Sequence, residues 1–155
     1  MGERPDHPGV RFPPPLLYAL AVVGGFLLDR TWPLPVGGAP FVKVFAWTLS
    51  AVWVVLTASS VGMFRRSRTS IIPMRPATAL VTTGPYRFTR NPMYVGLAML
   101  TVALALFLNT WWPTLLLVPV LLLVQRFVIR PEERYLHRRF GSEYDAYTRR
   151  VHRWL

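Results

Sequence analysis

Cysteine is absent from the 155-residue sequence, and lysine occurs once, at Lys43. Without cysteine, the chain forms no disulfide, no thiolate zinc site and no cysteine nucleophile. Metal binding would have to rest on three histidines, of which His137 has a carboxylate, Glu133, four residues before it. One such pair is more common as a surface contact on a helix than as a ligand set. We therefore expect no metal site.

Acidic residues are also scarce. There are seven, against eighteen basic residues, which gives a formal net charge of +11. Hydrophobic residues make up 52% of the chain, and the mean hydropathy is +0.32. A nucleic-acid-binding domain would carry its basic residues on a polar folded surface, whereas here the arginines gather at the ends of apolar runs. The combination indicates a membrane protein, and we expect no nucleic-acid partner.

Uncharged apolar runs predict an all-α fold with about four membrane-spanning helices. Residues 15–28 form a first run that is short for a bilayer, and residues 44–63 form the second and clearest run. Residues 93–125 contain no charged side chain, and as one helix they would be roughly 50 Å long, which is too long for one span. The sequence NTWWP, residues 109–113, supplies a turn, because proline suits a first helical turn and tryptophan a membrane interface. This run therefore predicts a helical hairpin, residues 94–108 and 111–129.

The placement of arginine predicts the orientation of these helices. Residues 64–92 carry six arginines and no acidic residue: Arg65, Arg66, Arg68, Arg75, Arg87 and Arg90. By the positive-inside rule this loop is cytoplasmic, and four spans then place both termini on the same side. We expect one multi-pass membrane domain. Its parts are a cytoplasmic tail (1–13), two spans (14–63), the cytoplasmic loop (64–92), the hairpin (93–130) and cytoplasmic helices (131–155).

Residues 131–155 change character and predict amphipathic helices outside the membrane. Pro131, Glu132 and Glu133 suit a first helical turn, where proline is tolerated and acids complement the helix dipole. Gly141 suits the end of this helix. Four hydrophobic side chains then recur at helical spacing and would cover either the membrane surface or the hairpin: Phe140, Tyr144, Tyr147 and Val151.

The sequence RNPMYVG, residues 90–96, combines charge and helix-start signals at the edge of an apolar run. Pro92 would begin the third span and leave the amides of its first turn unpaired, which attracts anionic groups. Arg90 could hold a carboxylate or phosphate there, and Tyr94 could stack on a planar ring. The alternative is an ordinary anchor, with arginine and tyrosine at the lipid headgroups.

The predicted hairpin places two distant segments of the chain together. Because its two helices are antiparallel and joined by a short turn, residues near 90 and near 132 return to the same membrane face. This predicts a pocket that combines arginines and carboxylates with tyrosines: Arg90, Arg130, Glu132, Glu133, Tyr86, Tyr94 and Tyr135. Alternatively, Glu132 and Glu133 only complement the helix dipole and pair with Arg126 or Arg130.

Two blocks of the sequence carry a family resemblance. The order LVTTGPYRFTRNPMYVG, then a hairpin, then PEERYLHRRFGSEYDAYTRRV closely resembles the isoprenylcysteine carboxyl methyltransferases and their relatives, the phospholipid and small-thiol methyltransferases. The resemblance covers residues 76–152. It implies a multi-span membrane enzyme that binds S-adenosylmethionine on the cytosolic side, between the hairpin and the C-terminal tail.

Site residues carried over from this resemblance fall into two groups. One group approaches the cofactor, partly through backbone, and consists of Thr78, Leu80, Val81, Gly84, Tyr86, Arg90, Asn91, Pro92, Met93 and Tyr94, with Glu132 or Glu133 closing the site. In the other group, Arg130 or Arg126 contacts the acceptor. The isoprenylcysteine enzymes often have histidine at the positions of Thr78 and Asn91, so this chain departs from their pattern at both.

The function expected from these features is S-adenosylmethionine-dependent methyl transfer at the membrane interface. The acceptor would be lipophilic or small and membrane-accessible, with a carboxylate, amine or thiol as the reacting group. Arg130 or Arg126 would orient an anionic acceptor, and Glu133 could take a proton from an amine or thiol. Two alternatives remain open, an NADPH-dependent membrane reductase related to sterol reductases and a non-catalytic membrane scaffold or lipid-binding protein.

Overall fold

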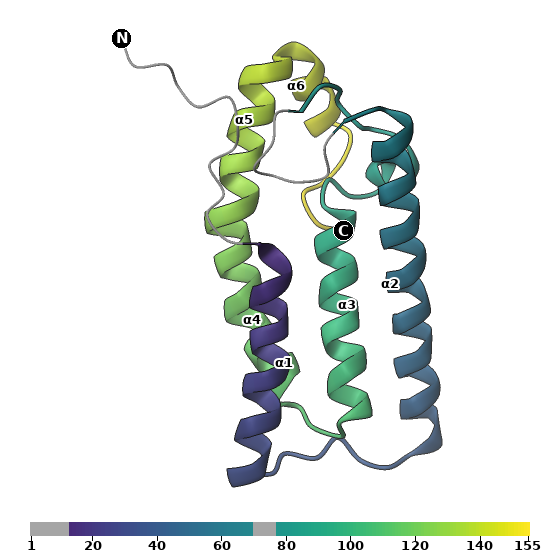
Figure 1. The fold of residues 1–155 in the computed structure, drawn as a ribbon, viewed down its shortest axis with the longest axis vertical. Helices are drawn as coiled ribbons and strands as arrows, with labels where there is room; N and C mark the ends of the chain where they lie inside the picture. Colours follow the sequence, from purple (N-terminus) through teal and green to yellow (C-terminus); the bar gives the residue numbers. More distant parts are fainter. Residues whose placement is uncertain (1–12, 70–76) are drawn as a thin grey trace.

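A computed structural model describes residues 13–69 and 77–155, and within these ranges all regular structure is helical (Figure 1). The all-α expectation is confirmed. The elements are α1 (Pro14–Thr31), α2 (Pro40–Arg66), the 3₁₀ turn η1 (Gly84–Arg87), α3 (Pro92–Phe107), α4 (Trp112–Val124), the π-helical turn η2 (Gln125–Ile129), α5 (Arg130–Phe140) and α6 (Ser142–Thr148). Residues 1–12 of the expected tail, and Arg75 in the expected loop, lie outside the described residues.

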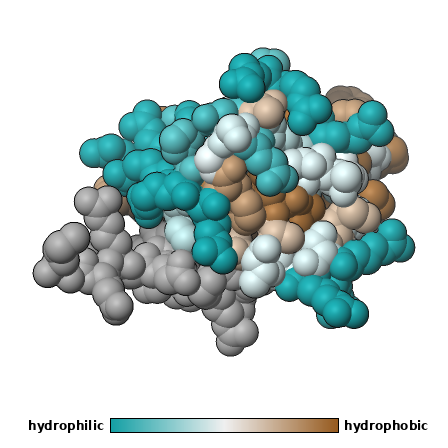
Figure 2. Space-filling view, turned by 90° about the horizontal axis from the view of Figure 1, so that it is seen from above, coloured by the Kyte–Doolittle hydropathy of each residue, from teal (hydrophilic) through white to brown (hydrophobic). Residues whose placement is uncertain are grey.

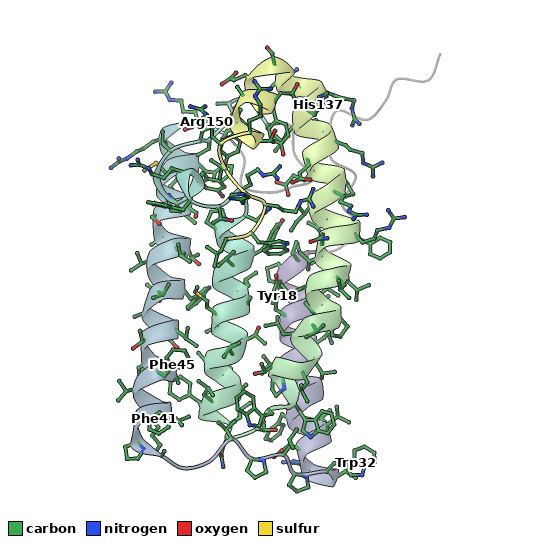
Figure 3. All side chains as sticks on the ribbon, turned by 180° about the vertical axis from the view of Figure 1, so that it is seen from behind. Tyr18, Trp32, Phe41, Phe45, His137 and Arg150 are labelled. Atoms are coloured by element: carbon green, nitrogen blue, oxygen red, sulfur yellow. The ribbon has the colours of Figure 1, made fainter. Side chains whose placement is uncertain are left out.

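The long helices lie side by side, with two different ends. α2 packs on α3, α3 packs on α1 and α4, and α1 packs on α4. η1, α5, α6 and residues 149–155 gather at one end, which we call the polar end (Figure 1). Seen from above this end, hydrophilic side chains surround a smaller hydrophobic area (Figure 2). Trp32, Phe41 and Phe45 lie at the opposite end from His137 and Arg150 (Figure 3), and we call it the far end.

Proline marks the starts of the helices, and asparagine marks the turn between α3 and α4. Each of the four long helices has a proline in its first turn, where the missing N–H needs no partner: Pro14, Pro40, Pro92 and Pro113. The turn between α3 and α4 lies at Asn109, whose φ of +55° is a conformation that asparagine tolerates better than most residues. α3 and α4 therefore pack against each other through a short turn at residues 108–111, close to the turn predicted at residues 109–113.

Fewer helices than the expected four are long and apolar enough to cross a membrane by themselves. Among the described residues there are two, Pro40–Arg66 and the continuous rod Trp112–Phe140, which joins α4, η2 and α5. The 16-residue α3 would be roughly 24 Å long at 1.5 Å per residue, short of a hydrocarbon core of about 30 Å. α1 includes Asp29 and Arg30 in its last turns. α1 therefore fails the criteria for a membrane span because of its charges, and α3 because of its length.

The outward face of α2 is apolar and exposed. Phe41 and Trp47 are 73% and 68% exposed, and Val44 and Val55 are each 66% exposed. A contiguous apolar surface of this kind is unusual for a soluble monomer and is typical of contact with lipid or protein. The exposure therefore agrees with the apolar composition of this helix.

The rod from Trp112 to Phe140 contains a change of helical register that sequence reasoning missed. In η2, the amide of Arg130 donates to the carbonyl of Gln125, five residues earlier rather than four. Pro131 follows and has no N–H to donate to the preceding turn. The helix therefore continues through the predicted start at Pro131, after a local widening that rotates α5 relative to α4. Gly141, with a φ of +52°, ends α5 as expected.

Two hydrophobic clusters hold the site elements in place. The first joins α1 to the α4–η2 rod through Tyr18, Ala21, Leu117, Val120, Val124, Val128 and Ile129. The second is formed by Tyr144, Tyr147 and Val151, with Leu80, Leu136 and Phe140 packed against it. The predicted stripe of α6 therefore faces the polar end of the protein itself, where it holds residues 80–87 against α5 and α6.

Candidate functional site

The segment before α3 is tied to the end of the chain by backbone and side-chain hydrogen bonds. The amide of Arg90 donates to the carbonyl of His152 at 2.9 Å. The Asn91 side-chain amide donates to the carbonyl of Arg153 at 2.8 Å, and the Thr89 hydroxyl donates to the same carbonyl at 3.2 Å. Asn91 thus serves the packing of the chain terminus in this structure.

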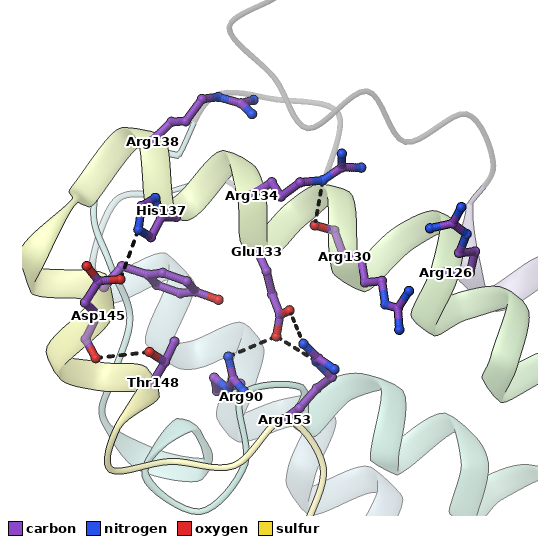
Figure 4. A pocket seen from close by; sticks show the side chains of 11 residues that line it. Arg90, Arg126, Arg130, Glu133, Arg134, His137, Arg138, Asp145, Thr148 and Arg153 are labelled. Carbon is purple, nitrogen blue, oxygen red and sulfur yellow. Dashed lines mark hydrogen bonds and ion pairs between the residues drawn. The ribbon is translucent and has the colours of Figure 1, made fainter.

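Glu133 lies at the centre of an ion-pair network at the polar end (Figure 4). Its Oε1 is 3.0 Å from Nη1 of Arg90, which precedes α3. Arg153 binds the same carboxylate with two bonds, Nε to Oε1 at 2.9 Å and Nη2 to Oε2 at 2.6 Å. The bonds to Glu133 raise the pKa of the Arg153 guanidinium above its usual range, so this group stays charged. The starts of α3 and α5 therefore lie together, as the hairpin topology predicts.

Glu132 has a different environment from its neighbour. Its Oε2 accepts a long hydrogen bond, 3.4 Å, from the hydroxyl of Tyr94, and no basic side chain of the described residues lies within ion-pair distance. Glu132 lies on the charged helix α5, beyond the apolar part of the rod. Burial, and to a lesser degree the charge of Glu133, raise its pKa to about 7, although the Tyr94 bond opposes the shift.

A broad, open pocket of about 840 Å³ lies beside this network. It is lined by Arg90, Arg126, Arg130, Glu133, Arg134, His137, Arg138, Tyr144, Asp145, Thr148 and Arg153. Both of its acidic residues are paired, Glu133 with the two arginines and Asp145 with His137 at 3.1 Å. The Nε of Arg90 is buried and has no hydrogen-bond partner among the described residues. The pocket therefore has an excess of positive charge and an unused buried donor.

Four of the predicted site residues line this pocket: Arg90, Arg126, Arg130 and Glu133. The others build its surroundings. Thr78 donates its hydroxyl to the carbonyl of Arg68 at 3.0 Å, Leu80 packs in the second cluster, and Val81 is buried. Gly84, with a φ of +61°, lies against Met63. Pro92 and Met93 lie in the first turn of α3, where Pro92 is buried.

Tyr86 is also part of the supporting structure. It is buried against the ring of Phe64, with centroids 5.6 Å apart, and its carbonyl accepts a 2.7 Å hydrogen bond from the hydroxyl of Tyr147. This bond joins η1 to α6. Tyr86 therefore positions the segment before Arg90 and does not line the pocket.

Sequence reasoning missed seven residues of the pocket lining: Arg134, His137, Arg138, Tyr144, Asp145, Thr148 and Arg153. His137 and Arg138 share α5 with Glu133, and Tyr144 belongs to the predicted stripe, so helical spacing carried a signal for them. Arg153 follows α6 in irregular structure, twenty residues after Glu133, and no periodicity links the two.

Comparison with known proteins gives one family and two relatives. The phospholipid methyltransferase family model matches residues 41–143, more than half of the chain. Over 63 residues the chain is 36% identical to an uncharacterized protein of Haemophilus influenzae, which covers 41% of this chain and all of that protein. Over 107 residues it is 32% identical to the nickel-cobalt-cadmium resistance protein NccN of Alcaligenes xylosoxydans xylosoxydans, which covers 64% of this chain and 50% of that protein.

No solved structure matches the chain. The family match covers the chain from α2 to α5 and includes Arg90, between η1 and α3, and Glu132 and Glu133, on α5. The chain therefore belongs to the phospholipid methyltransferase family, among the membrane methyltransferases related to the isoprenylcysteine carboxyl methyltransferases.

Proposed function

We propose that this protein is an S-adenosylmethionine-dependent methyltransferase that acts at the membrane surface on a lipophilic or small membrane-accessible acceptor. The observation that carries the proposal is the meeting of Arg90, Glu133 and the Glu132–Tyr94 pair at the polar end of apolar helices. A pocket in this place is open to solvent above the lipid-facing surface. A polar cofactor and a lipophilic acceptor could therefore reach it from opposite sides.

The residues of the pocket fit the polar part of the cofactor, which carries a carboxylate and an ammonium group. The buried, unpaired Nε of Arg90 is a donor for a carboxylate. Glu132 does not line the pocket, but it directly precedes Glu133 in α5 and is a carboxylate without a cationic partner in the described chain, which suits an ammonium group. The volume, about 840 Å³, lies within the range of small-molecule sites, roughly 300–1,000 Å³.

The chemistry requires positioning more than a reactive side chain. When bound, the cofactor supplies a methyl group on a sulfonium, which an acceptor displaces in line. The protein has to hold the acceptor in attack geometry and exclude water. Arg126 and Arg130 would orient an anionic acceptor. No covalent nucleophile is needed, in agreement with the cysteine-free composition.

Glu133 is poorly placed to take a proton from an amine or thiol, because both of its oxygens are engaged by arginines. Glu132 accepts only the long bond from Tyr94, which leaves it open to the ammonium group of the cofactor. We therefore propose that Glu133 organises the site by charge and that Glu132 binds the cofactor.

The proposed placement is multi-pass, with the polar end in the cytoplasm. Support comes from the arginines at this end and from the two helices that can span a membrane. In this arrangement α1 and α3 also cross, since α3 packs between α2 and α4, and α1 packs along α3 and α4.

Binding of S-adenosylhomocysteine, measured by calorimetry on the purified protein in detergent, tests the proposal. We expect Glu132→Gln to weaken binding by at least about tenfold, because it removes the carboxylate proposed for the ammonium group. Glu143→Gln, an exposed acid on α6 away from the pocket lining, is the matched control and should bind normally. A wild-type protein that neither binds this ligand nor transfers labelled methyl groups to lipid extracts would refute the proposal.

No observation in the described residues favours the reductase alternative, and its test is competition by NADPH in the same assay. The name of NccN links that relative to metal resistance. In the described residues, no group of three or more histidine, aspartate and glutamate side chains is arranged to hold a metal ion.

A further inference from the structure

The last five residues connect three separate parts of the polar end. We call residues 151–155 the C-terminal strap. Its backbone accepts hydrogen bonds from Thr89, Arg90 and Asn91, just before α3. Its tryptophan, Trp154, donates from Nε1 to the side-chain oxygen of Gln125 at 2.9 Å and packs on the first cluster. The strap therefore joins the start of α3 to the π turn η2.

Arg153 makes the third connection, to Glu133 on α5. The two bonds have the parallel geometry of a bidentate guanidinium–carboxylate pair, the strongest arrangement available to these groups. Glu133 is only 15% exposed, so this pair is poorly screened by solvent. The second arginine on the same carboxylate, Arg90, comes from the segment proposed to bind the cofactor.

Two arginines on one carboxylate leave one unit of positive charge at this point. Arg153 takes both oxygens, so Arg90 shares Oε1 through a single nitrogen and keeps its buried Nε free. Without Arg153, Arg90 could turn to bind Glu133 side-on, through Nε and one terminal nitrogen. The free Nε, and the excess charge beside it, depend on the presence of the second arginine.

We infer that Arg153 is a positioning residue, which holds Glu133 so that Arg90 keeps a donor directed at the carboxylate of the bound ligand. The inference rests on the proposed function, and it concerns a part of the chain that follows the family match, which ends at residue 143. Arg153 acts through Glu133 and Arg90, and the strap fixes Arg153 by its hydrogen bonds to residues 89–91. The C-terminal strap is thereby a component of the binding site.

The test measures S-adenosylhomocysteine affinity in detergent for Arg153→Gln and Arg153→Lys, with Arg149→Gln as control. Arg149 is exposed, follows α6 and does not line the pocket. We expect Arg153→Gln to weaken binding by at least about tenfold, since the loss of one partner of a buried charged pair is costly. Arg153→Lys, which keeps the charge but not the bidentate geometry, should recover part of the affinity, and Arg149→Gln should match wild type.

A double-mutant cycle separates positioning from general loss of structure. If Arg153 acts through Glu133, the variant Glu133→Gln/Arg153→Gln should bind no worse than Glu133→Gln alone. Additive losses, or normal affinity of Arg153→Gln per folded molecule, would overturn the inference. Folded protein is counted by size-exclusion and thermal unfolding of each sample. Absence of binding by wild type would instead refute the proposed function, so the two failures are distinguishable.

Trp154→Phe provides a second variant, which keeps an aromatic side chain but replaces the indole by a smaller phenyl ring and so removes the bond to Gln125 together with part of the packing on the first cluster. If the strap is part of the site, this change should also weaken ligand binding, by less than Arg153→Gln does, because a neutral hydrogen bond is lost and no charge is left unpaired. Wild-type affinity in a folded Trp154→Phe protein would contradict the inference that the C-terminal strap is a component of the binding site.

Discussion

Glu132 and Glu133 are adjacent in sequence and have opposite surroundings, which follows from helical geometry. Successive residues of a helix point about 100° apart, so one carboxylate meets Arg90 and Arg153 while the other meets Tyr94. The paired carboxylate organises the site by charge. The unpaired one is partly buried without compensation, and its pKa is raised for that reason.

The raised pKa of Glu132 predicts a pH dependence of stability. The folded protein holds this proton up to about pH 7, whereas in the unfolded chain the carboxyl has its ordinary pKa near 4.5. Between these values the folded state binds more protons, so the free energy of unfolding falls as pH rises, and it levels off above about 7. Glu132→Gln should remove this component. The measurement is the difference in thermal midpoint between wild type and variant from pH 5 to pH 8 in detergent. A difference that does not change with pH would contradict the prediction.

Sequence reasoning at this scale found the residues whose positions follow from topology. The proximity of Arg90 and Glu133 was predictable from the sequence, because a helical hairpin returns the start of its first helix and the end of its second helix to one side of the membrane. The position of Arg153 was not predictable, since it lies in irregular structure whose path depends on hydrogen bonds to residues 89–91. The roles of Thr78, Leu80 and Val81 came from a family resemblance, and the structure places these residues in the supporting packing around the pocket.

At the scale of elements, the contact between α1 and α4 depends on a missing side chain. A Cβ added at Gly25 would lie 2.5 Å from the backbone nitrogen of Pro113 and 2.7 Å from its ring, distances that require one helix to move. At the neighbouring Gly24, the added Cβ would lie 3.5 Å from Leu116, which is ordinary contact. The same chemical change therefore has different consequences at two adjacent positions.

We expect Gly25→Ala to lower the thermal midpoint and Gly24→Ala to keep or raise it. Both variants gain helix propensity, about 1 kcal/mol, but overpacking at Gly25 costs roughly 1–3 kcal/mol. Tryptophan fluorescence during thermal unfolding in detergent measures the difference. Equal midpoints for the two variants would show that α1 and α4 are not in the close contact described.

Helix starts were the most predictable elements, because proline and its position in the first turn act locally. Pro92 and Pro113 begin α3 and α4 as expected. The π turn was not predictable in this way. It depends on which carbonyl the Arg130 amide reaches, and that choice is made by the packing of Val128 and Ile129 against α1 as well as by Pro131.

For the whole molecule, the two ends differ in the side chains that suit each side of a membrane. Arginines occupy the polar end, and the far end is closed by Asp29, which accepts hydrogen bonds from Thr110 and from the amide of Leu34, and by Trp112, which donates to the carbonyl of Trp32. Within residues 13–69 and 77–155, two helices qualify as spans by themselves. The proposal of four crossings is supported by the antiparallel packing of α1 on α4 and of α3 on α2 (Figure 1).

The cysteine-free sequence permits a direct test of orientation. Gly38→Cys places a thiol in the exposed loop at the far end, and Ser142→Cys places one on the exposed start of α6 at the polar end. We expect a membrane-impermeant maleimide to label Gly38→Cys in intact cells, and to label Ser142→Cys only after the membrane is permeabilised. The reverse pattern would place the polar end outside the cell, and equal labelling of both in intact cells would contradict a fixed orientation.

The π turn makes the number of residues between Trp112 and Glu133 a functional quantity. The π turn holds one residue more than an ordinary α-helical turn. Removing one residue from Gln125–Ile129 would therefore let the helix close to regular α-helical bonding with Glu133 still directed at Arg90, whereas removing a second would turn every later position of α5 by about 100° and direct Glu133 away from Arg90. Phe127, which is 60% exposed, illustrates the consequence. Its side chain contributes little to the core, so many replacements should be accepted there, whereas the segment can lose one residue and not two. In this segment, chain length is constrained more strongly than chemical identity.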